Sequence, residues 1–327
     1  MRQHRMWLGL MVWVIASGAH RATAETWVLK DGEKLEVVAD APQDQYQQAI
    51  AVLKDLVREG DVKEVKEALK QYKEDLPERI GPDLELFVLG EVQYWADHYG
   101  KALVKYEKLL KDYPGSEYAG LTLQREFAMA NEYLQGRKKK ILGILKIHAY
   151  EDGVELLEKI SDRAGLDEPN GVGLRAAITV AEYYEGREHY NEAYLKWSEI
   201  ASYWETGPVG KRALYRMAEN NLAAYNRYPA EKRANYDASK LTAAKTYYQK
   251  FLLLYPKEAK ENEVPQKIEE IDEEMALKQY AIGRYYRRTG ERRAAHLYFD
   301  MVVQNWPKTE AAALAKEALD EDGAGGK

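Results

Sequence analysis

The sequence predicts an all-α protein: a right-handed solenoid of about six helical hairpins, with a small β-hairpin at its N-terminal end. Three features predict this fold: a helical spacing of apolar residues, an internal repeat, and a turn dipeptide near the N-terminus. From Gln43 onward, apolar residues recur at intervals of three and four, as in amphipathic helices. Turn signals such as Gly60-Asp61 and Leu76-Pro77 divide this pattern into short helices, which we expect to pair along the chain.

Residues 1–24 are predicted to form a cleavable signal peptide for export. Arg2 and Arg5 give a basic start, and residues 6–19 are uncharged and mostly apolar. The small residues of Ala22-Thr23-Ala24 then provide a cleavage site. The alternative is an uncleaved membrane anchor, which is disfavoured because a spanning helix needs about 20 apolar residues.

Residues 25–42 are predicted to form an N-terminal hairpin or arm. Asp31-Gly32 lies between two short apolar segments, Trp27–Leu29 and Leu35–Val38, and this arrangement is typical of a β-hairpin. The alternative is an extended arm packed on the first helix, because a two-stranded hairpin is marginally stable by itself.

An internal repeat runs through residues 43–319, the region predicted to form the solenoid. Two copies agree in spacing without a gap: Gly90, Ala102, Tyr106 and Pro114, and then Gly283, Ala295, Phe299 and Pro307. A third copy contains Ala181, Ala193 and Trp197. A small residue on each helix lets the helices cross closely, so the glycine of each copy should contact its alanine. The ring fills the space beside the crossing, and the proline ends the hairpin. This pattern resembles the tetratricopeptide repeat.

Two insertions and a terminal cap complete the predicted organisation. Residues 136–152 and 226–239 are expected to lengthen loops inside the third and fifth repeats. Residues 310–319 are expected to form a capping helix, because the last repeat needs a polar cover. Residues 320–327 are acidic and then glycine-rich, and are expected to be a disordered tail.

Composition narrows the function. The chain has no cysteine, which excludes a disulfide framework, a thiolate zinc site and a cysteine nucleophile. Its formal net charge of −6 argues against binding nucleic acid through a basic surface. A basic run, Lys138–Lys140, lies in the first insertion. The favoured interpretation of this run is a solvated loop, and the alternative is contact with anionic lipid.

The histidines do not suggest catalysis. Outside the predicted signal they are scattered, without a partner at helical metal-binding spacing: His98, His148, His189 and His296. We therefore expect no metal, no cofactor and no enzymatic activity. An enzyme is kept as the least favoured class.

The predicted solenoid suggests a protein-binding groove. In such arrays the first helices of successive repeats line a concave channel. By position in the repeat, the groove-facing residues should be Phe87, Glu91, Tyr94, Glu182 and Glu185, followed by Tyr280, Arg284 and Arg287. The middle repeats are acidic here and the last is basic, which suggests two different partners.

The last two repeats resemble the BamD family, the tetratricopeptide-repeat lipoproteins of the outer-membrane β-barrel assembly machinery. The segments that carry the resemblance are Tyr236-Asp237-Ala238, Ala243–Pro256, Ala281–Gly290 and Phe299–Pro307. The resemblance implies an adaptor whose last repeats dock the barrel-bearing subunit and whose earlier repeats receive unfolded outer-membrane polypeptides. It implies that Arg284, Arg287 and Arg288 face that subunit, and that Phe87, Glu91 and Tyr94 accept client segments.

One departure from the family concerns localisation. Family members are held to the membrane by a lipid on a cysteine after the signal, and this sequence has no cysteine. We therefore expect a protein in the periplasm, at the inner face of the outer membrane, exported by a cleavable signal and associated with the membrane indirectly or weakly. The alternatives are anchoring by an uncleaved signal, or loss of the connection to the machinery.

The predicted function is a non-enzymatic periplasmic repeat scaffold. It would bind polypeptide segments and a partner subunit in outer-membrane β-barrel assembly. The alternative is a periplasmic repeat adaptor for cell-envelope or division complexes.

Overall fold

A computed structural model of the protein describes residues 26–30, 34–38, 45–141 and 145–324. The predicted signal, residues 1–24, lies outside the described residues. The chain divides into two compact units, residues 1–135 and 136–327. Within the described ranges no helix is both long enough and apolar enough to span a membrane.

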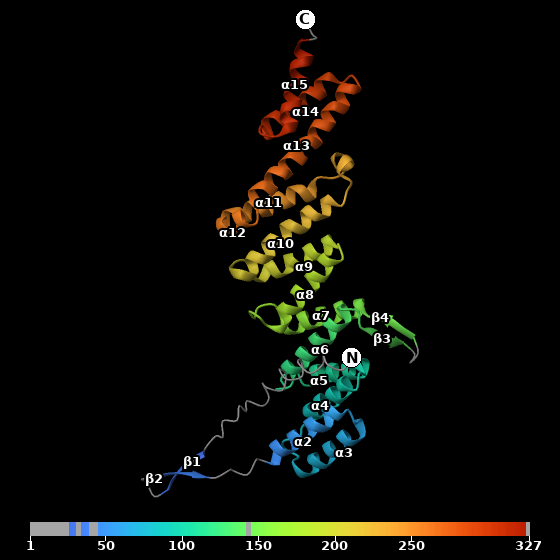
Figure 1. The fold of residues 1–327 in the computed structure, drawn as a ribbon, viewed down its shortest axis with the longest axis vertical. Coiled ribbons are helices and arrows are strands. Elements are labelled where there is room, and N and C mark those ends of the chain that lie inside the picture. The colour runs from blue at the N-terminus through green and yellow to red at the C-terminus, as the bar shows by residue number, and fades with distance from the viewer. Residues whose placement is uncertain (1–25, 31–33, 39–44, 142–144, 325–327) are drawn as a thin grey trace. The chain divides into compact units, whose positions relative to one another are not determined.

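The N-terminal unit begins with the predicted β-hairpin. Strand β1 (Thr26–Lys30) pairs antiparallel with β2 (Lys34–Val38), with Val28 opposite Glu36. The helices that follow are α2 (Gln45–Glu59), α3 (Val62–Asp75), α4 (Pro82–Trp95), α5 (Tyr99–Asp112) and α6 (Ala119–Leu134). Helix α2 packs on α3, and α4 packs on α5, so the expected helical hairpins form here (Figure 1).

The C-terminal unit continues the series of helical hairpins. Its elements are β3 (Lys138–Ile141), β4 (Leu145–His148), α7 (Tyr150–Ala164), α8 (Val172–Gly186), α9 (Tyr190–Tyr203), α10 (Gly207–Asn226), the 3-10 turn η2 (Ala230–Asn235), α11 (Ser239–Leu254), α12 (Pro256–Glu261), α13 (Val264–Arg288), α14 (Arg292–Asn305) and α15 (Glu310–Ala324). The hairpins are α8 with α9, α10 with α11, and α13 with α14. The all-α fold of repeated helical hairpins, with a small N-terminal β-hairpin, is confirmed.

Local sequence explains where the helices begin and end. Asp61 caps α3 by accepting hydrogen bonds from the backbone N–H groups of Lys63 (2.8 Å) and Glu64 (3.1 Å). The turn inside a hairpin has one residue in the left-handed region, and this residue falls at the same repeat position in three hairpins: Asp97 (φ 67°), Glu188 (φ 60°) and Gly290 (φ 86°). The repeat read from the sequence is therefore a repeat of backbone conformation as well.

A ring packs against the glycine at two of the helix crossings. A Cβ built on Gly90 would lie 2.3 Å from Cε1 of Tyr106, and one built on Gly283 would lie 2.6 Å from Cε1 of Phe299. The glycine therefore makes room for the ring. Each ring is fully buried, because it is pressed against the backbone of the opposite helix.

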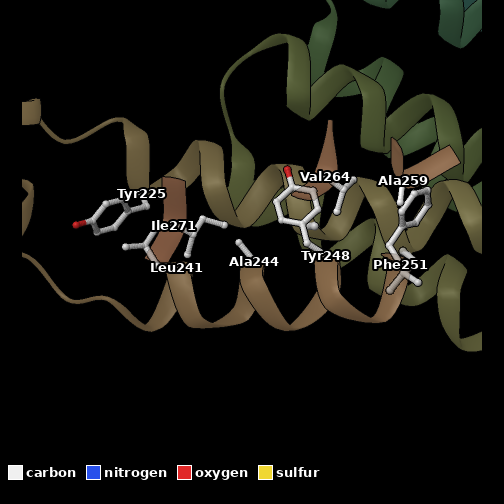
Figure 2. Packing of buried hydrophobic residues seen from close by; sticks show 10 residues of the cluster. Tyr225, Leu241, Ala244, Tyr248, Phe251, Ala259, Val264 and Ile271 are labelled. Carbon is white, nitrogen blue, oxygen red and sulfur yellow. The ribbon is translucent and has the colours of Figure 1, made fainter. Parts of the chain in front are cut away.

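A hydrophobic core runs between the hairpins of the C-terminal unit. Figure 2 shows one cluster, in which Leu241 of α11 lies beside Ile271 of α13, and Tyr248 lies further along α11 beside Val264. Tyr225 closes the cluster and donates a hydrogen bond to the backbone oxygen of Arg233 (3.1 Å). This bond holds the turn η2 against the core.

Both insertions are more ordered than the loops that were predicted. The first, residues 136–152, contains the β3–β4 hairpin, in which Lys139 is opposite Ile147. The second, residues 226–239, contains η2, where Arg233 donates to the backbone oxygens of Tyr228 (2.9 Å) and Asn226 (3.1 Å). Pairing and hydrogen bonds therefore order the described parts of both insertions.

The last helix also extends further than predicted. Helix α15 continues to Ala324, past the expected end at Leu319 and into the predicted tail. Ala318 is buried, and Glu321 forms an ion pair with Arg287 of α13 at 2.9 Å. This pair ties the extra turn to the last hairpin.

We predict that Gly283→Ala destabilises the protein by about 1–3 kcal/mol, because the added methyl overlaps a buried ring. Gly186→Ala is the matched control: a Cβ there meets nothing within 4 Å, and alanine favours a helix. Thermal unfolding measures both changes. Equal melting temperatures for Gly283→Ala and the wild type would contradict the described crossing.

Candidate functional site

The N-terminal unit contains a buried ion pair built on the helix crossing. Glu91 of α4 follows Gly90 directly and is 0% exposed. Its Oε1 accepts hydrogen bonds from the Tyr106 hydroxyl (2.5 Å) and from Arg125 Nε (2.7 Å), and its Oε2 accepts from Arg125 Nη2 (2.6 Å). The Arg125 guanidinium, which comes from α6, also lies over the Tyr94 ring at 4.3 Å. The carboxylate thus accepts three hydrogen bonds, one from Tyr106 and two from Arg125.

The ionisation of this group follows from its surroundings. Burial alone would lower the pKa of Arg125, but the charge and hydrogen bonds of Glu91 outweigh burial and hold that pKa above its ordinary value. Burial, reinforced by Glu91, raises the pKa of Tyr106. Arg125 is therefore charged and Tyr106 is neutral, and the pair with Glu91 is a bidentate buried salt bridge.

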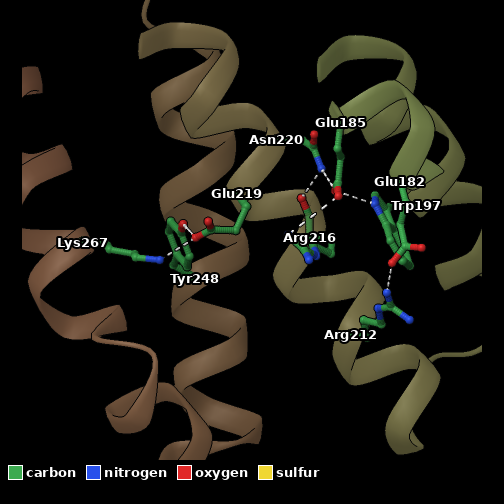
Figure 3. Close-up of polar contacts among 9 residues, drawn as sticks. All are labelled: Glu182, Glu185, Trp197, Arg212, Arg216, Glu219, Asn220, Tyr248 and Lys267. Atoms are coloured by element: carbon green, nitrogen blue, oxygen red, sulfur yellow. Dashed lines mark hydrogen bonds and ion pairs between the residues drawn. The ribbon is translucent and has the colours of Figure 1, made fainter. Parts of the chain in front are cut away.

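A second acid cluster lies in the C-terminal unit (Figure 3). Glu182 of α8 forms an ion pair with Arg212 of α10. Glu185, one helical turn on, accepts hydrogen bonds at Oε1 from Trp197 Nε1 (2.7 Å) and Asn220 Nδ2 (2.7 Å). Both carboxylates that we predicted to face a client are thus bound within the protein.

A third cluster follows on the next hairpin. Glu219 of α10 accepts hydrogen bonds from the Tyr248 hydroxyl and from Lys267 Nζ of α13 (2.6 Å) (Figure 3). Lys267 also donates to the Tyr215 hydroxyl at 2.8 Å. Burial alone would raise the pKa of Glu219, but the hydrogen bonds from Lys267 and Tyr248 outweigh it and hold that pKa below its ordinary value.

The three clusters share one pattern, which we call the acid–base ladder. In each cluster the acid lies on the first helix of a hairpin, directly after a buried small residue. The base lies on the next long helix after that hairpin in the sequence. The members are Glu91 with Arg125, Glu182 with Arg212, and Glu219 with Lys267. We did not predict the bases. The signal that could have identified them is a Lys or Arg on the long helix after a hairpin whose crossing carries an acid.

The predicted client-binding residues of the N-terminal unit are mostly inaccessible. Phe87 is 3% exposed and stacks on Tyr118, with 5.3 Å between the ring centroids. Glu91 is enclosed in its ion pair, and Tyr94 is half-buried beneath Arg125. The prediction that Phe87 and Glu91 face an open groove is wrong, since both side chains belong to the packing around the crossing.

The predicted partner-contact residues lie together on the last turns of α13. Tyr280 packs against Phe299, and Arg287 is paired with Glu321. Arg284 and Arg288 are exposed, and each lies near a tyrosine ring, at 5.9 Å and 5.8 Å from the centroid. Neither forms an ion pair with any described residue.

Arg284 stands where the acid–base ladder would have its next acid, directly after Gly283. The last hairpin therefore presents uncompensated positive charge. No cluster of three or more potential metal ligands occurs among the described residues.

We predict that Arg125→Met destabilises the protein by about 3–5 kcal/mol, because it leaves the Glu91 carboxylate buried without its counter-charge. The double variant Glu91→Gln with Arg125→Met should recover most of that loss, since glutamine keeps an acceptor for the Tyr106 hydroxyl. Denaturant unfolding compares the two. A double variant less stable than Arg125→Met would contradict the buried pair.

We also predict a pH-dependent contribution from Glu219. Its folded-state pKa is lowered, so its stabilisation is present above the unfolded carboxyl pKa of about 4.3 and is lost as the pH falls through the folded pKa. The melting-temperature gap between wild type and Glu219→Gln should therefore be largest at neutral pH and close on acidification. Glu317→Gln, on the exposed face of α15, should show no such gap.

Comparisons with known proteins agree with the fold and with part of the resemblance. Residues 190–321 match the YfiO family, described as an outer membrane lipoprotein, and residues 86–116 match a tetratricopeptide repeat. No curated protein matches the chain.

Two solved structures of tetratricopeptide-repeat proteins are similar to it. One is the C-terminal part of a repeat-containing protein from Cytophaga hutchinsonii: 12% identity, covering 83% of this chain and 85% of that one, with a TM-score of 0.34. The other is from Parabacteroides merdae: 17% identity, covering 84% and 97%, with a TM-score of 0.31.

The comparison corrects the predicted localisation. We expected a periplasmic protein without a lipidation cysteine, and the matched family is described as an outer membrane lipoprotein, which points to lipidation. The expectation of no lipid rested on composition alone, because the sequence contains no cysteine. The repeats and the partial family match together support a protein-interaction scaffold with tetratricopeptide repeats, similar over residues 190–321 to that lipoprotein family.

Proposed function

We propose that this protein is a non-enzymatic repeat scaffold that binds polypeptide segments and a partner subunit during outer-membrane β-barrel assembly. The observation that carries the proposal is the charge of the last hairpin. Arg284 and Arg288 are exposed and unpaired among the described residues, within the segment that matches the lipoprotein family. These two side chains can therefore form ion pairs with acidic residues of a partner.

The partner for this surface should be acidic where it meets α13. Arginine suits such a contact because its planar guanidinium binds a carboxylate through two parallel hydrogen bonds. Tyr280 and Tyr285 lie beside the two arginines and add apolar surface with a polar edge. Arg287 is already engaged by Glu321, so we assign it to holding α15 in place rather than to the contact itself.

Client polypeptides would bind elsewhere on the first helices. Of the predicted client set, Tyr94, Glu182 and Glu185 keep partly exposed side chains. The two glutamates are in ion pairs with Arg212 and Arg216, so a client would meet a neutral, hydrogen-bonding surface instead of an acidic one. Such a surface favours contacts with an extended backbone over recognition of basic segments.

The second candidate is an adaptor for other cell-envelope or division complexes. This candidate stays open because the lipoprotein-family match covers only residues 190–321. The N-terminal unit matches only a tetratricopeptide repeat, which does not favour either candidate. A fluorescent fusion separates the candidates: concentration at the division site supports the adaptor, and an even distribution around the envelope supports barrel assembly.

The direct test is capture of partners from an envelope extract with the full chain. We expect a barrel-assembly subunit to be recovered by the wild type and reduced at least about tenfold by Arg284→Glu with Arg288→Glu. The matched control, Lys232→Glu with Lys250→Glu, makes the same charge change at other exposed positions. Equal recovery by both variants, or no such subunit with the wild type, would contradict the proposal.

A further inference from the structure

Helix α13 carries its charged residues in two blocks. Residues 264–275 contain five acids and one lysine, whereas residues 276–288 contain four basic residues and no acid. A helix favours acids near its N-terminus and bases near its C-terminus, but this preference acts only within the first and last turns. Glu270 and Arg284 lie further into the helix than those turns, so the helix dipole does not account for them.

One exposed line of residues runs along α13 and crosses both blocks. We call it the α13 stripe, and its members, all exposed, are Gln266, Glu270, Leu277, Arg284 and Arg288. Their spacings of four, seven, seven and four residues place them on one face, because seven residues are close to two helical turns. Leu277, which is 37% exposed, lies at the centre of the stripe.

Neighbouring elements engage α13 on both sides of the stripe. On one side, Lys278 donates to the backbone oxygen of Ala234 in η2 (2.9 Å). On the other, Glu273 accepts a hydrogen bond from the backbone N–H of Ala311 in α15 (3.0 Å). In total, six charged residues of α13 outside the stripe have partners within the chain: Lys267, Asp272, Glu273, Glu274, Lys278 and Arg287.

The charged members of the stripe lack such partners. Glu270, Arg284 and Arg288 form no ion pair with any residue in the described part of the chain. Leu277 places an apolar side chain between them, where a solvent-facing helix position usually carries a polar residue. The stripe is therefore an unpartnered helix face with an apolar centre, an acid on one side of that centre and bases on the other.

The order of residues in the stripe is complementary to its own reverse. Glu270 lies seven residues before Leu277 and Arg284 seven after it, while Gln266 and Arg288 lie eleven before and eleven after. In an antiparallel copy with Leu277 opposite Leu277, each Glu270 would meet Arg284 of the second copy. A two-fold contact of this kind forms every favourable pair twice. An unrelated acidic protein would satisfy the two arginines but would leave Glu270 facing like charge.

We propose that two copies of this chain associate through the α13 stripe, antiparallel and with two-fold symmetry about Leu277. Each guanidinium would bind a carboxylate through two hydrogen bonds, and the two Leu277 side chains would remove apolar surface from water. The inference does not rest on the proposed role in barrel assembly. Arg284 and Arg288 take part in both contacts, so a second copy and an acidic partner subunit would exclude each other.

Analytical ultracentrifugation of the full chain tests the proposal. We expect a reversible dimer whose dissociation constant rises as salt screens the ion pairs. Glu270→Arg and Arg284→Glu each place like charges opposite one another at two symmetric positions, so each should weaken the dimer at least about tenfold.

Two combinations should restore the dimer. The double variant Glu270→Arg with Arg284→Glu keeps opposite charges in contact and should associate as the wild type does. An equal mixture of the two single variants should form a mixed dimer, since one chain then presents arginine at both positions and the other presents glutamate. Neither result is expected if the two residues do not meet across the contact.

The matched control is Glu205→Arg, which makes the same charge change at an exposed position between α9 and α10 and should leave the dimer unchanged. Thermal unfolding checks the fold: both stripe positions are exposed, so each single variant should melt as the wild type does. A wild-type chain that is monomeric at low salt, an equal loss with Glu205→Arg, or a double variant no tighter than the single ones would overturn the proposal.

Capture of the barrel-assembly subunit separates this inference from the proposed function. Glu270 is not part of the contact proposed for that subunit, so Glu270→Arg should weaken self-association and leave capture at least as strong as in the wild type. An intact dimer without capture would contradict the proposed function alone. A monomeric wild type that captures the subunit would contradict self-association alone.

Discussion

The contact between a small residue on one helix and a ring on the other governs much of this structure. The rings at these crossings are Tyr106, Trp197 and Tyr248, and each carries a hydroxyl or N–H group into a buried site. A buried donor needs an acceptor, because leaving it unpaired costs about 1–3 kcal/mol. A glutamate on the facing helix supplies that acceptor in all three hairpins. The glutamate in turn needs a positive charge, and a following helix provides one. In the hairpins of Tyr106 and Tyr248 this glutamate is the ladder acid itself. In the α8–α9 hairpin Trp197 donates to Glu185, one helical turn after the ladder acid Glu182.

The last hairpin tests this chain of causes. Its ring is Phe299, which has no polar atom and therefore needs no acceptor on α13. No acid is therefore needed after Gly283, and the residue at that position is Arg284. The last hairpin therefore carries a positive charge at the position where the hairpins of Tyr106 and Tyr248 carry the acid that accepts from the ring.

The hairpins and their crossings could be predicted because small residue, ring and proline recur at fixed local intervals. The pairing of charges could not. Arg125 lies 34 residues beyond Glu91, and Lys267 lies 48 beyond Glu219, so the insertions change the spacing and no single period reveals it. The same limit explains why Glu91 was expected in an open groove. Its position on the helix was readable, but the base that covers it comes from a different hairpin.

The acid–base ladder also affects which basic residues remain unpaired at the surface of this acidic protein. Each acid–base pair cancels its own field at short range, so those positions contribute little to attraction of a distant partner. Unpaired cations stand out against that neutral background, and among the described residues of α13 they include Arg284 and Arg288. Both arginines lie beside tyrosine rings, as suits a contact with a protein carboxylate.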